Sequence, residues 1–238
     1  MRVLITRPQG DAEILAERLR AAGHEVILAP LLNIMPLSGP ELDLRAVAAV
    51  LLTSANGARA LAKRTAARDV AVFAVGDVTA RTARDLGFMN IASAGGDVAD
   101  LIALVRRALP PCRLIHVAAS VSAGDLAGEL GKAGFSVERV VAYEARPVAV
   151  LPAAAAHVLG AGEVDVALFY SPRTGRVFVD LVRQAGLERK LAKVTAAALS
   201  DAVAATLQSL SWRRIVIAKE PTEAALLSAI GLNVGEAT

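Results

Sequence analysis

The sequence contains few cysteine, histidine and aromatic residues, and each shortage argues against a class of function. A single cysteine rules out an intrachain disulfide framework. The three histidines are scattered and show no His-x-x-x-His or Cys-x-x-Cys spacing, so we do not expect a metal site. Aromatic residues make up only 3% of the 238 residues, which leaves few platforms for stacking nucleic-acid bases.

Charge of one sign and long hydrophobic runs are also scarce. The formal net charge is +3, and no run of Lys and Arg suggests a surface that follows phosphates. No apolar stretch reaches the roughly 18 residues of a membrane span, and the chain opens on a strand-like run rather than on a charged and then apolar leader. We therefore expect a soluble, cytoplasmic protein without a nucleic-acid or membrane partner.

What the chain does have is a largely aliphatic composition, in which short apolar runs alternate with helical patterns. Hydrophobic residues account for 55% of the sequence. Continuously apolar runs separated by amphipathic helices are typical of parallel sheets covered on both faces, which predicts an α/β fold. The predicted strands cover residues 3–5, 26–28, 50–52, 70–75, 114–117, 137–141, 166–170, 194–199 and 215–218. The first predicted helix covers about 11–22, places Ile14, Leu15 and Leu19 on one side, and ends at Gly23.

The sequence also repeats itself. Residues 2–32 align without a gap to residues 113–143, and residues 51–54 align to residues 168–171. A match of this length favours true duplication over the general likeness of βα units, and it predicts two domains of the same build.

Two partitions of the chain fit this duplication. A tandem split would fall near Leu109, whereas a nested split would join residues 1–33 to 147–238 and insert residues 34–146 between them. We favour nesting, because the crossings at 31–36 and 143–147 are extended segments that could pair as a linker.

Polar residues that start helices follow several of the predicted strands. Ser54 and Ser171 are typical helix caps after matching strands, and free backbone amides at such positions attract carboxylates or phosphates. A purely structural capping role is the alternative for each, but the same device in both repeats favours anion binding as well. Arg7, at the end of the first strand, is a candidate carboxylate clamp, although a solvent-exposed arginine is an equal alternative.

The motifs of nucleotide-binding and nucleophilic enzymes are absent. There is no Gly-x-Gly-x-x-Gly turn, no phosphate-binding loop and no Gly-x-Ser-x-Gly elbow. These absences indicate a protein that works mainly by holding a ligand in shape.

Six short motifs in order resemble the uroporphyrinogen-III synthase family over essentially the whole chain. They are Val3-Leu4-Ile5-Thr6-Arg7-Pro8, Leu52-Thr53-Ser54-Ala55-Asn56-Gly57-Ala58, Ala74-Val75-Gly76-Asp77-Val78-Thr79-Ala80, Val140-Val141-Ala142-Tyr143-Glu144, Phe169-Tyr170-Ser171-Pro172-Arg173 and Ala218-Lys219-Glu220-Pro221-Thr222. The resemblance implies two flavodoxin-like domains with parallel sheets, joined by a two-stranded linker, with the active site in the cleft between them.

The resemblance also implies a function. The expected substrate is hydroxymethylbilane, an acidic linear tetrapyrrole, which a cofactor-free lyase closes to uroporphyrinogen III. Water is lost and the last pyrrole ring is inverted through a spiro intermediate. We expect a monomer that makes at most transient contact with the preceding, bilane-forming enzyme.

The matching motifs imply candidate site residues. Tyr143 is expected to donate a hydrogen bond to the departing hydroxyl, with a linker tyrosine that merely packs its ring as the alternative. Many family members carry a threonine where this chain has Leu199-Ser200-Asp201-Ala202-Val203, so Ser200 is expected to supply that hydroxyl. The expected substrate-binding residues are Arg7, Ser54, Asn56, Gly76, Thr79, Gly96, Ser171, Arg173, Ser200 and Thr222.

Two other functions compete with this reading. One is a non-catalytic, two-lobed small-molecule binding protein, disfavoured because the sequence shows no export signal. The other is a nucleotide-dependent transferase, disfavoured by the missing glycine-rich turn.

Overall fold

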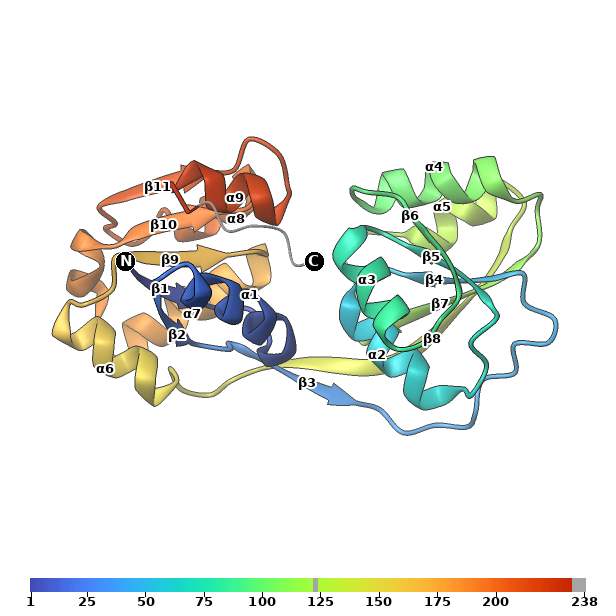
Figure 1. The fold of residues 1–238 in the computed structure, drawn as a ribbon, viewed down its shortest axis with the longest axis horizontal. Coiled ribbons are helices and arrows are strands. Elements are labelled where there is room, and N and C mark those ends of the chain that lie inside the picture. Colours follow the sequence, from blue (N-terminus) through green and yellow to red (C-terminus); the bar gives the residue numbers. More distant parts are fainter. Residues whose placement is uncertain (122–123, 233–238) are drawn as a thin grey trace. The chain divides into compact units, whose positions relative to one another are not determined.

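The computed structural model describes residues 1–121 and 124–232, and they form two compact units (Figure 1). The first unit joins Met1–Asn33 to the residues from Arg146 onward, and the second is Ile34–Ala145. Both have an α/β architecture.

The first unit is a parallel sheet with helices on both faces. Its strands are β1 (Arg2–Ile5), β2 (Glu25–Leu28), β9 (Val166–Phe169), β10 (Thr195–Ala198) and β11 (Arg214–Ile217). The spatial order β11-β10-β9-β1-β2 is the 2-1-3-4-5 order of flavodoxin-like sheets. Its helices are α1 (Gln9–Ala21), α6 (Ala153–Ala161), α7 (Pro172–Gln184), α8 (Asp201–Leu207) and α9 (Glu223–Ala229), with a 3-10 turn at Glu188–Lys193.

Two apolar layers cover this sheet. Helices α6, α7 and α8 pack on one face, and α1 and α9 pack on the other. Because both faces are covered, the side chains of β1 from Val3 to Ile5 are fully buried, which explains the continuously apolar strands. Three of the few aromatic residues gather in the first layer, where the ring of Phe169 lies 5.0 Å from Phe178 and 5.8 Å from Trp212.

The second unit repeats this architecture. Its sheet has the order β3-β8-β7-β4-β5-β6, with α2 and α3 on one face and α4 and α5 on the other. The strands are β3 (Leu32–Pro36), β4 (Ala49–Leu52), β5 (Ala71–Ala74), β6 (Asn90–Ser93), β7 (Arg113–Ala119) and β8 (Ser136–Pro147). The helices are α2 (Ala55–Arg64), α3 (Asp77–Asp85), α4 (Val98–Ala108) and α5 (Leu126–Lys132).

The two sheets have the same spatial order once their strands are matched through the aligned segments. The alignment equates β7 with β1, β8 with β2 and β4 with β9, so β8-β7-β4-β5-β6 corresponds to β2-β1-β9-β10-β11. The first helix of each aligned segment ends before a glycine with positive φ, +80° at Gly23 and +86° at Gly134, a backbone conformation that glycine adopts without strain.

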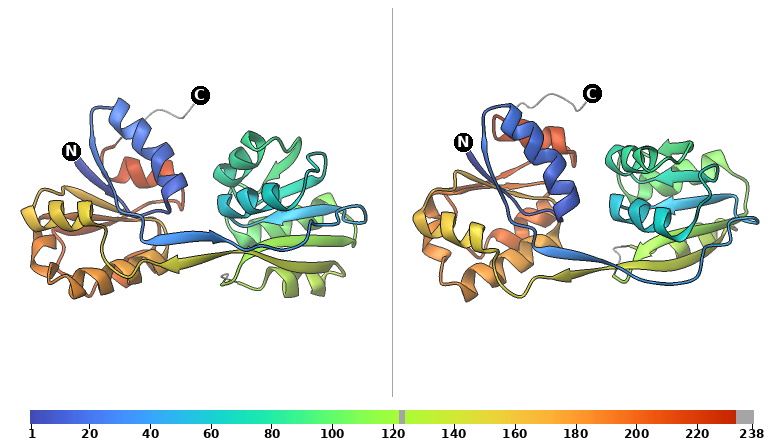
Figure 2. Two further views of the ribbon diagram at one scale, coloured as in Figure 1. Left: turned by 90° about the horizontal axis from the view of Figure 1, so that it is seen from below. Right: turned by 60° about the horizontal axis from the view of Figure 1, so that its bottom comes forward.

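Strands β3 and β8 contain the two points where the chain passes between the units, and they are neighbours in one sheet (Figure 2). The amide of Leu37 donates to the carbonyl of Ala142 at 2.9 Å, and the amide of Val148 donates to Leu31 at 3.1 Å. The sequence predicted that the crossings at 31–36 and 143–147 pair, and β3 and β8 do pair. It also predicted a strand ending at 141, whereas β8 is one strand of 12 residues that carries Tyr143 in its body.

The predicted apolar side of the first helix was wrong at one residue, and one strand was missed. Ile14 is 49% exposed, because the buried face of α1 is formed by Ala12, Leu15, Ala16 and Leu19, and Ile14 lies off that face. Strand β6 was missed, because its sequence, Asn-Ile-Ala-Ser, is partly polar and it lies at the edge of its sheet.

Candidate active site

The candidate site residues follow strands, so they lie at the carboxyl edges of the two parallel sheets. In open sheets of this kind, ligands bind where the strand order reverses. That point lies between β1 and β9 in the first unit and between the equivalent strands β7 and β4 in the second. Arg7 follows β1 and Ser171 follows β9, while Ser54 follows β4.

In the second unit, this point brings together Ser54 and Tyr143, which the sequence had suggested separately. Ser54 caps α2, and its Oγ accepts a hydrogen bond from the amide of Gly57 at 3.2 Å. The same Oγ lies 2.6 Å from the hydroxyl of Tyr143. The carbonyl of Tyr143 accepts from the amide of Ser120 at 2.9 Å, which holds this part of β8 beside the end of β7. Tyr143 is 6% exposed and Ser54 is half-buried, so a partly buried pair of hydroxyls lies at the switch point.

The start of α2 is held close to β7 by a glycine. A Cβ on Gly57 would lie 3.0 Å from the carbonyl oxygen of Val117, so a larger residue would push the helix away from the strand. The side chain of Asn56, in the first turn, accepts a hydrogen bond from Arg59 at 2.9 Å. Asn56 is half-buried, and its side-chain oxygen is engaged by Arg59.

Gly76 and Gly96 lie together at the ends of the next two strands. Gly76 is the N-cap of α3, the amide of Gly96 donates to the carbonyl of Val75 at 3.1 Å, and a Cβ on Gly76 would lie 3.7 Å from the carbonyl of Gly96. Gly96 precedes Asp97, which caps α4. Thr79 differs from these residues because it is buried in the first turn of α3, with 5% exposure.

In the first unit, Arg7 is bound by carboxylates of the protein itself. Its Nη1 donates to Glu223 at 2.6 Å, and its Nη2 lies 3.8 Å from Asp11. Arg18 donates to the other oxygen of Glu223, also at 2.6 Å. The guanidinium of Arg7 lies 4.4 Å from the centre of the Tyr170 ring. A ligand carboxylate at Arg7 would therefore have to compete with Glu223.

Tyr170 was not among the predicted site residues, although it immediately precedes Ser171 in a matching motif. Among the described residues its buried hydroxyl has no hydrogen-bond partner. Burial, followed by the negative charge of Glu223, raises the pKa of Tyr170, so the phenol stays protonated. Nearby, the hydroxyl of Thr6 donates to the carbonyl of Leu168 at 2.6 Å and ties the end of β1 to β9.

The remaining predicted residues of the first unit start helices. Ser171 caps α7 by accepting from the amide of Thr174 at 3.1 Å, and Thr222 caps α9 by accepting from Ala225 at 3.2 Å. Ser200 begins α8 without a side-chain bond to the helix. Arg173 is half-buried in the first turn of α7.

His116 is a second residue that the sequence did not suggest. It is buried on β7, and its Nε2 lies 3.3 Å from the hydroxyl of Thr53. Burial, with a smaller effect of the positive Arg139, lowers the pKa of His116 to about 4. The imidazole is therefore neutral at pH 7, which suits a structural role beside the site.

Comparison with known proteins identifies the family. The family model described as uroporphyrinogen-III synthase HemD matches residues 13–228.

The chain belongs to the uroporphyrinogen-III synthase family.

Two solved structures of uroporphyrinogen-III synthases share its fold. The Helicobacter pylori synthetase has 21% identity and a TM-score of 0.66, and the alignment covers 98% of this chain and all of that one. A mutant synthase from Thermus thermophilus has 17% identity and a TM-score of 0.51, with 97% and 96% of the two chains covered. No curated protein matched in sequence. The family is one of cyclising lyases in tetrapyrrole biosynthesis, and neither finding favours a non-catalytic binding protein.

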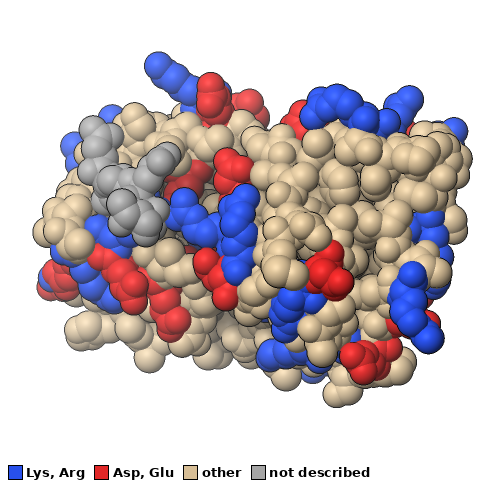
Figure 3. Space-filling view, turned by 45° about the vertical axis from the view of Figure 1, so that its right-hand side comes forward, with Lys and Arg blue, Asp and Glu red and all other residues tan. Residues whose placement is uncertain are grey.

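The surface of the chain carries charges of both signs. On the face drawn in Figure 3, Lys and Arg side chains are interspersed with Asp and Glu side chains.

Within residues 1–121 and 124–232, no group of three or more His, Cys, Asp or Glu side chains is placed to hold a metal ion. In that same part of the chain, no helix has both the length and the apolar character needed to cross a bilayer.

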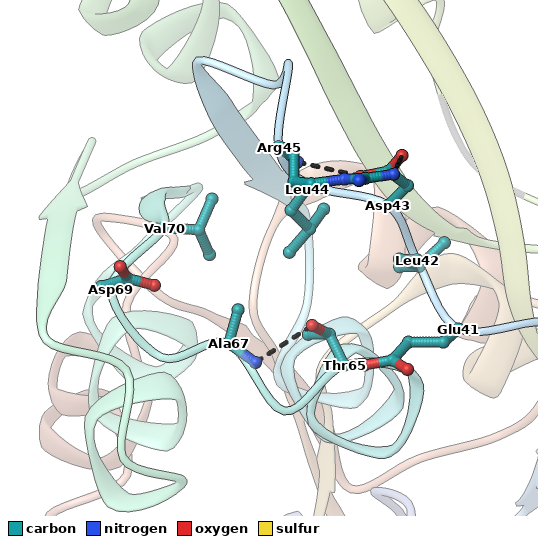
Figure 4. Close-up of a pocket in the computed structure, with 9 residues that line it drawn as sticks. All are labelled: Glu41, Leu42, Asp43, Leu44, Arg45, Thr65, Ala67, Asp69 and Val70. Atoms are coloured by element: carbon teal, nitrogen blue, oxygen red, sulfur yellow. Dashed lines mark hydrogen bonds and ion pairs between the residues drawn. The ribbon is translucent and has the colours of Figure 1, made fainter.

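A cavity of about 510 Å³ in the second unit lies away from the synthase candidate site (Figure 4). It is lined by side chains from the 41–45 and 65–70 segments, which precede β4 and β5. It therefore opens at the amino edge of the sheet, whereas Ser54 and Gly76 lie beyond the carboxyl edge. Arg45 closes on Asp43 there in an ion pair of 2.8 Å.

Proposed function

We propose that this protein converts hydroxymethylbilane to uroporphyrinogen III. The family match over most of the chain supports this activity, because the family's reaction is this cyclisation. The carbon–oxygen bond of the terminal hydroxymethyl group breaks, and the oxygen takes up a proton and leaves as water. The resulting azafulvenium-like carbon is attacked through a spiro intermediate, which reopens and recloses with the last ring inverted. A proton is lost at the end, so the net change is the loss of one water.

In this proposal, Tyr143 gives its proton to the departing hydroxyl through a hydrogen bond, and the resulting phenolate takes back the proton that the closed ring releases. The support is its position: its hydroxyl is held 2.6 Å from Ser54 at the point of the second sheet where the strand order reverses. A phenol is suited to the task, since its ordinary pKa near ~10 keeps it protonated at neutral pH.

The substrate's acetate and propionate groups are held at the starts of helices that follow the strands. Ser54, Ser171 and Thr222 are N-caps in the structure, and helix N-termini favour negative charge. Arg7 binds one carboxylate by exchanging Glu223 for it. The other proposed binding residues are Asn56, Gly76, Thr79, Gly96, Arg173 and Ser200, with Thr79 and Asn56 contributing through the helix starts that they help to build.

We propose further that both units, as the two domains of the synthase, contact one substrate molecule. The support is the duplication, which places equivalent capped helices at the carboxyl edge of each sheet. Conformational control of a reactive intermediate then accounts for most of the catalysis, through proximity and electrostatics. The enzyme works as a monomer in the cytoplasm and receives its unstable substrate through transient contact with the bilane-forming enzyme.

The variant Tyr143→Phe tests the catalytic assignment. It removes one hydroxyl and almost no volume, so the fold should survive. Loss of a donor used mainly in the transition state should cost roughly 2.7–4 kcal/mol, or about 10²–10³ in turnover. Spontaneous closure without inversion then competes, so the uninverted isomer should accumulate beside the inverted one. A folded Tyr143→Phe protein with wild-type turnover and only the inverted isomer would remove Tyr143 from the mechanism.

A further inference from the structure

The short contact between Ser54 and Tyr143 gives Ser54 a more specific task than capping a helix or binding a carboxylate. A serine hydroxyl has one proton and can accept at two lone pairs. Its Oγ accepts one hydrogen bond from the amide of Gly57 at 3.2 Å and lies 2.6 Å from the Tyr143 hydroxyl. In that second contact, either Tyr143 donates to Ser54 or Ser54 donates to Tyr143.

The two arrangements differ in what they leave for a ligand. If Tyr143 donates to Ser54, its only proton is engaged within the protein. If Ser54 donates to the phenol oxygen, the proton of Tyr143 can be directed to a ligand. The second arrangement forms a chain in which the Gly57 amide donates to Ser54, Ser54 donates to Tyr143, and Tyr143 donates onward.

Two features of the structure favour that direction of donation when a ligand is present. Hydrogen bonds in series polarise one another, so the bond from Gly57 makes the Ser54 hydroxyl a stronger donor. Ser54 also sits at the N-terminus of α2, a helix of 10 residues, whose partial positive charge favours electron density shifted toward the helix. Both effects make the phenol of Tyr143 a better proton donor.

We infer that Ser54 is a positioning residue that holds Tyr143 in place and donates a hydrogen bond to its phenol oxygen during the reaction. The inference rests on the proposed role of Tyr143. This role belongs to the second unit alone. The equivalent serine of the first unit, Ser171, has its Oγ 2.8 Å from the hydroxyl of Thr174 in its own helix. Ser171 is therefore the matched control, a cap of the same kind without a tyrosine hydroxyl.

A double-mutant cycle measures this coupling in turnover. Ser54→Ala should lower kcat about tenfold, since an ordinary hydrogen bond is worth about that factor. In the Tyr143→Phe background the same change should cost less than about twofold. Ser171→Ala should act by the same factor in both backgrounds, because distant and independent sites are additive. Equal effects of Ser54→Ala in the two backgrounds would overturn the inference.

Two further variants separate the hydroxyl from the cap. Glycine is almost as good an N-cap as serine, so Ser54→Gly should keep α2 and the melting temperature while losing the same factor in kcat. Ser54→Thr retains a hydroxyl and should recover most of the activity. If Ser54→Gly restored turnover, the cap rather than the hydroxyl would be responsible, and the inference would fail.

A spectroscopic signature tests the contact without any catalysis. The chain has two tyrosines, so labelling the Cζ carbon of tyrosine gives two resonances. Tyr170→Phe assigns them, and it should be tolerated because that hydroxyl has no partner among the described residues. Ser54→Ala should shift the Tyr143 resonance, and Ser171→Ala should not. An unmoved resonance would refute the Ser54–Tyr143 bond.

These experiments distinguish failure of the proposed role of Tyr143 from failure of the inferred role of Ser54. If Tyr143→Phe retained wild-type turnover, the proposed role of Tyr143 would fail and this inference with it. If Tyr143→Phe were impaired but the cycle showed no coupling, only the role of Ser54 would be lost.

Discussion

At the residue scale, each unit has a tyrosine beside its candidate site residues, but Tyr143 lies on β8 whereas Tyr170 follows β9, and the two make different contacts. In the second unit, the hydroxyl of Tyr143 is hydrogen-bonded to Ser54. In the first unit, the guanidinium of Arg7 packs over the ring of Tyr170. The second unit therefore has a phenol paired with a serine, whereas the first has an arginine that is already paired with Glu223. This asymmetry fits the proposal that Tyr143 assists departure of the hydroxyl and that Arg7 exchanges Glu223 for a substrate carboxylate.

The ion pairs of Glu223 predict opposite effects for two substitutions. If Arg7 binds a substrate carboxylate, Arg7→Ala should raise KM about tenfold with little loss of kcat, because the carboxylate is bound alike before and during the reaction. Glu223→Gln removes the competing carboxylate, so KM should fall several-fold. Rising salt should raise KM in the wild type, because it screens the attraction between the substrate's carboxylates and the positive groups that bind them.

Arg45→Ala is the control for this pair, because it removes an exposed arginine at the amino edge of the second sheet. Steady-state kinetics of the three variants decide the question. Wild-type KM in both Arg7→Ala and Glu223→Gln would show that Arg7 only ties the end of β1 to α9.

The buried imidazole of His116 predicts how stability depends on pH. Its pKa falls from the ordinary 6.5 to about 4 in the folded protein, so between these values the unfolded chain binds the extra proton. The folded state should therefore be most stable above about pH 6.5 and lose up to roughly 3 kcal/mol as the pH falls toward 4. Denaturant unfolding at several pH values measures this slope.

His116→Asn should flatten that slope, whereas His157→Asn, which removes an exposed imidazole on α6, reports the effect of losing a histidine as such. If both variants kept the full acid-induced loss between pH 6.5 and 4, the destabilisation would arise elsewhere.

The sequence could predict which residues follow strands but not which of them touch. Ser54 and Ser171 were expected to be helix caps from local chemistry alone, and both are. The Ser54–Tyr143 bond joins residues 89 positions apart, and the Arg7–Glu223 pair spans 216 positions. Such contacts depend on sheet order and side-chain direction, which no local pattern contains.

At the element scale, helix α7 packs so closely against α8 that a side chain at Gly175 would meet a residue of α8. A Cβ on Gly175 would lie 2.1 Å from the hydroxyl oxygen of Thr206. Gly175→Ala should destabilise the protein by about 1–3 kcal/mol, the usual cost of overpacking. Thr206→Ala removes the oxygen in conflict and should restore most of that loss in the double variant.

Gly131→Ala on α5 is the matched control, since nothing lies within 4 Å of its would-be Cβ. It should be neutral or stabilising by up to about 1 kcal/mol, because alanine is the better helix former. Denaturant unfolding compares the three variants, and equal stability of Gly175→Ala and Gly131→Ala would contradict the packing account.

Elements with strong local patterns were predictable and those at edges were not. The buried strands β1, β4 and β9 were found from their apolar runs, since every residue of β4 and β9 is buried. Strand β6 was missed because it is partly exposed and polar. The continuity of β8 through Tyr143 was also missed, since residues 143–147 lack the apolar run that precedes them and are held by pairing with β3.

At the scale of the whole molecule, the fold class could be predicted because it depends on the repetition of a simple pattern. Parallel sheets follow from alternating apolar strands and amphipathic helices, and the structure has two of them with one spatial order. Function required more than this pattern, because the same fold supports many activities. The family match over residues 13–228 supplies that step.

The central claim is that this protein directs hydroxymethylbilane to the inverted isomer. The most direct measurement incubates the purified protein with freshly generated hydroxymethylbilane, oxidises the products and separates the two uroporphyrin isomers. Without enzyme the bilane closes to the uninverted isomer, so the fraction of the inverted isomer should rise with protein concentration until it accounts for nearly all of the product. An isomer composition that stays the same with and without the protein would contradict the account.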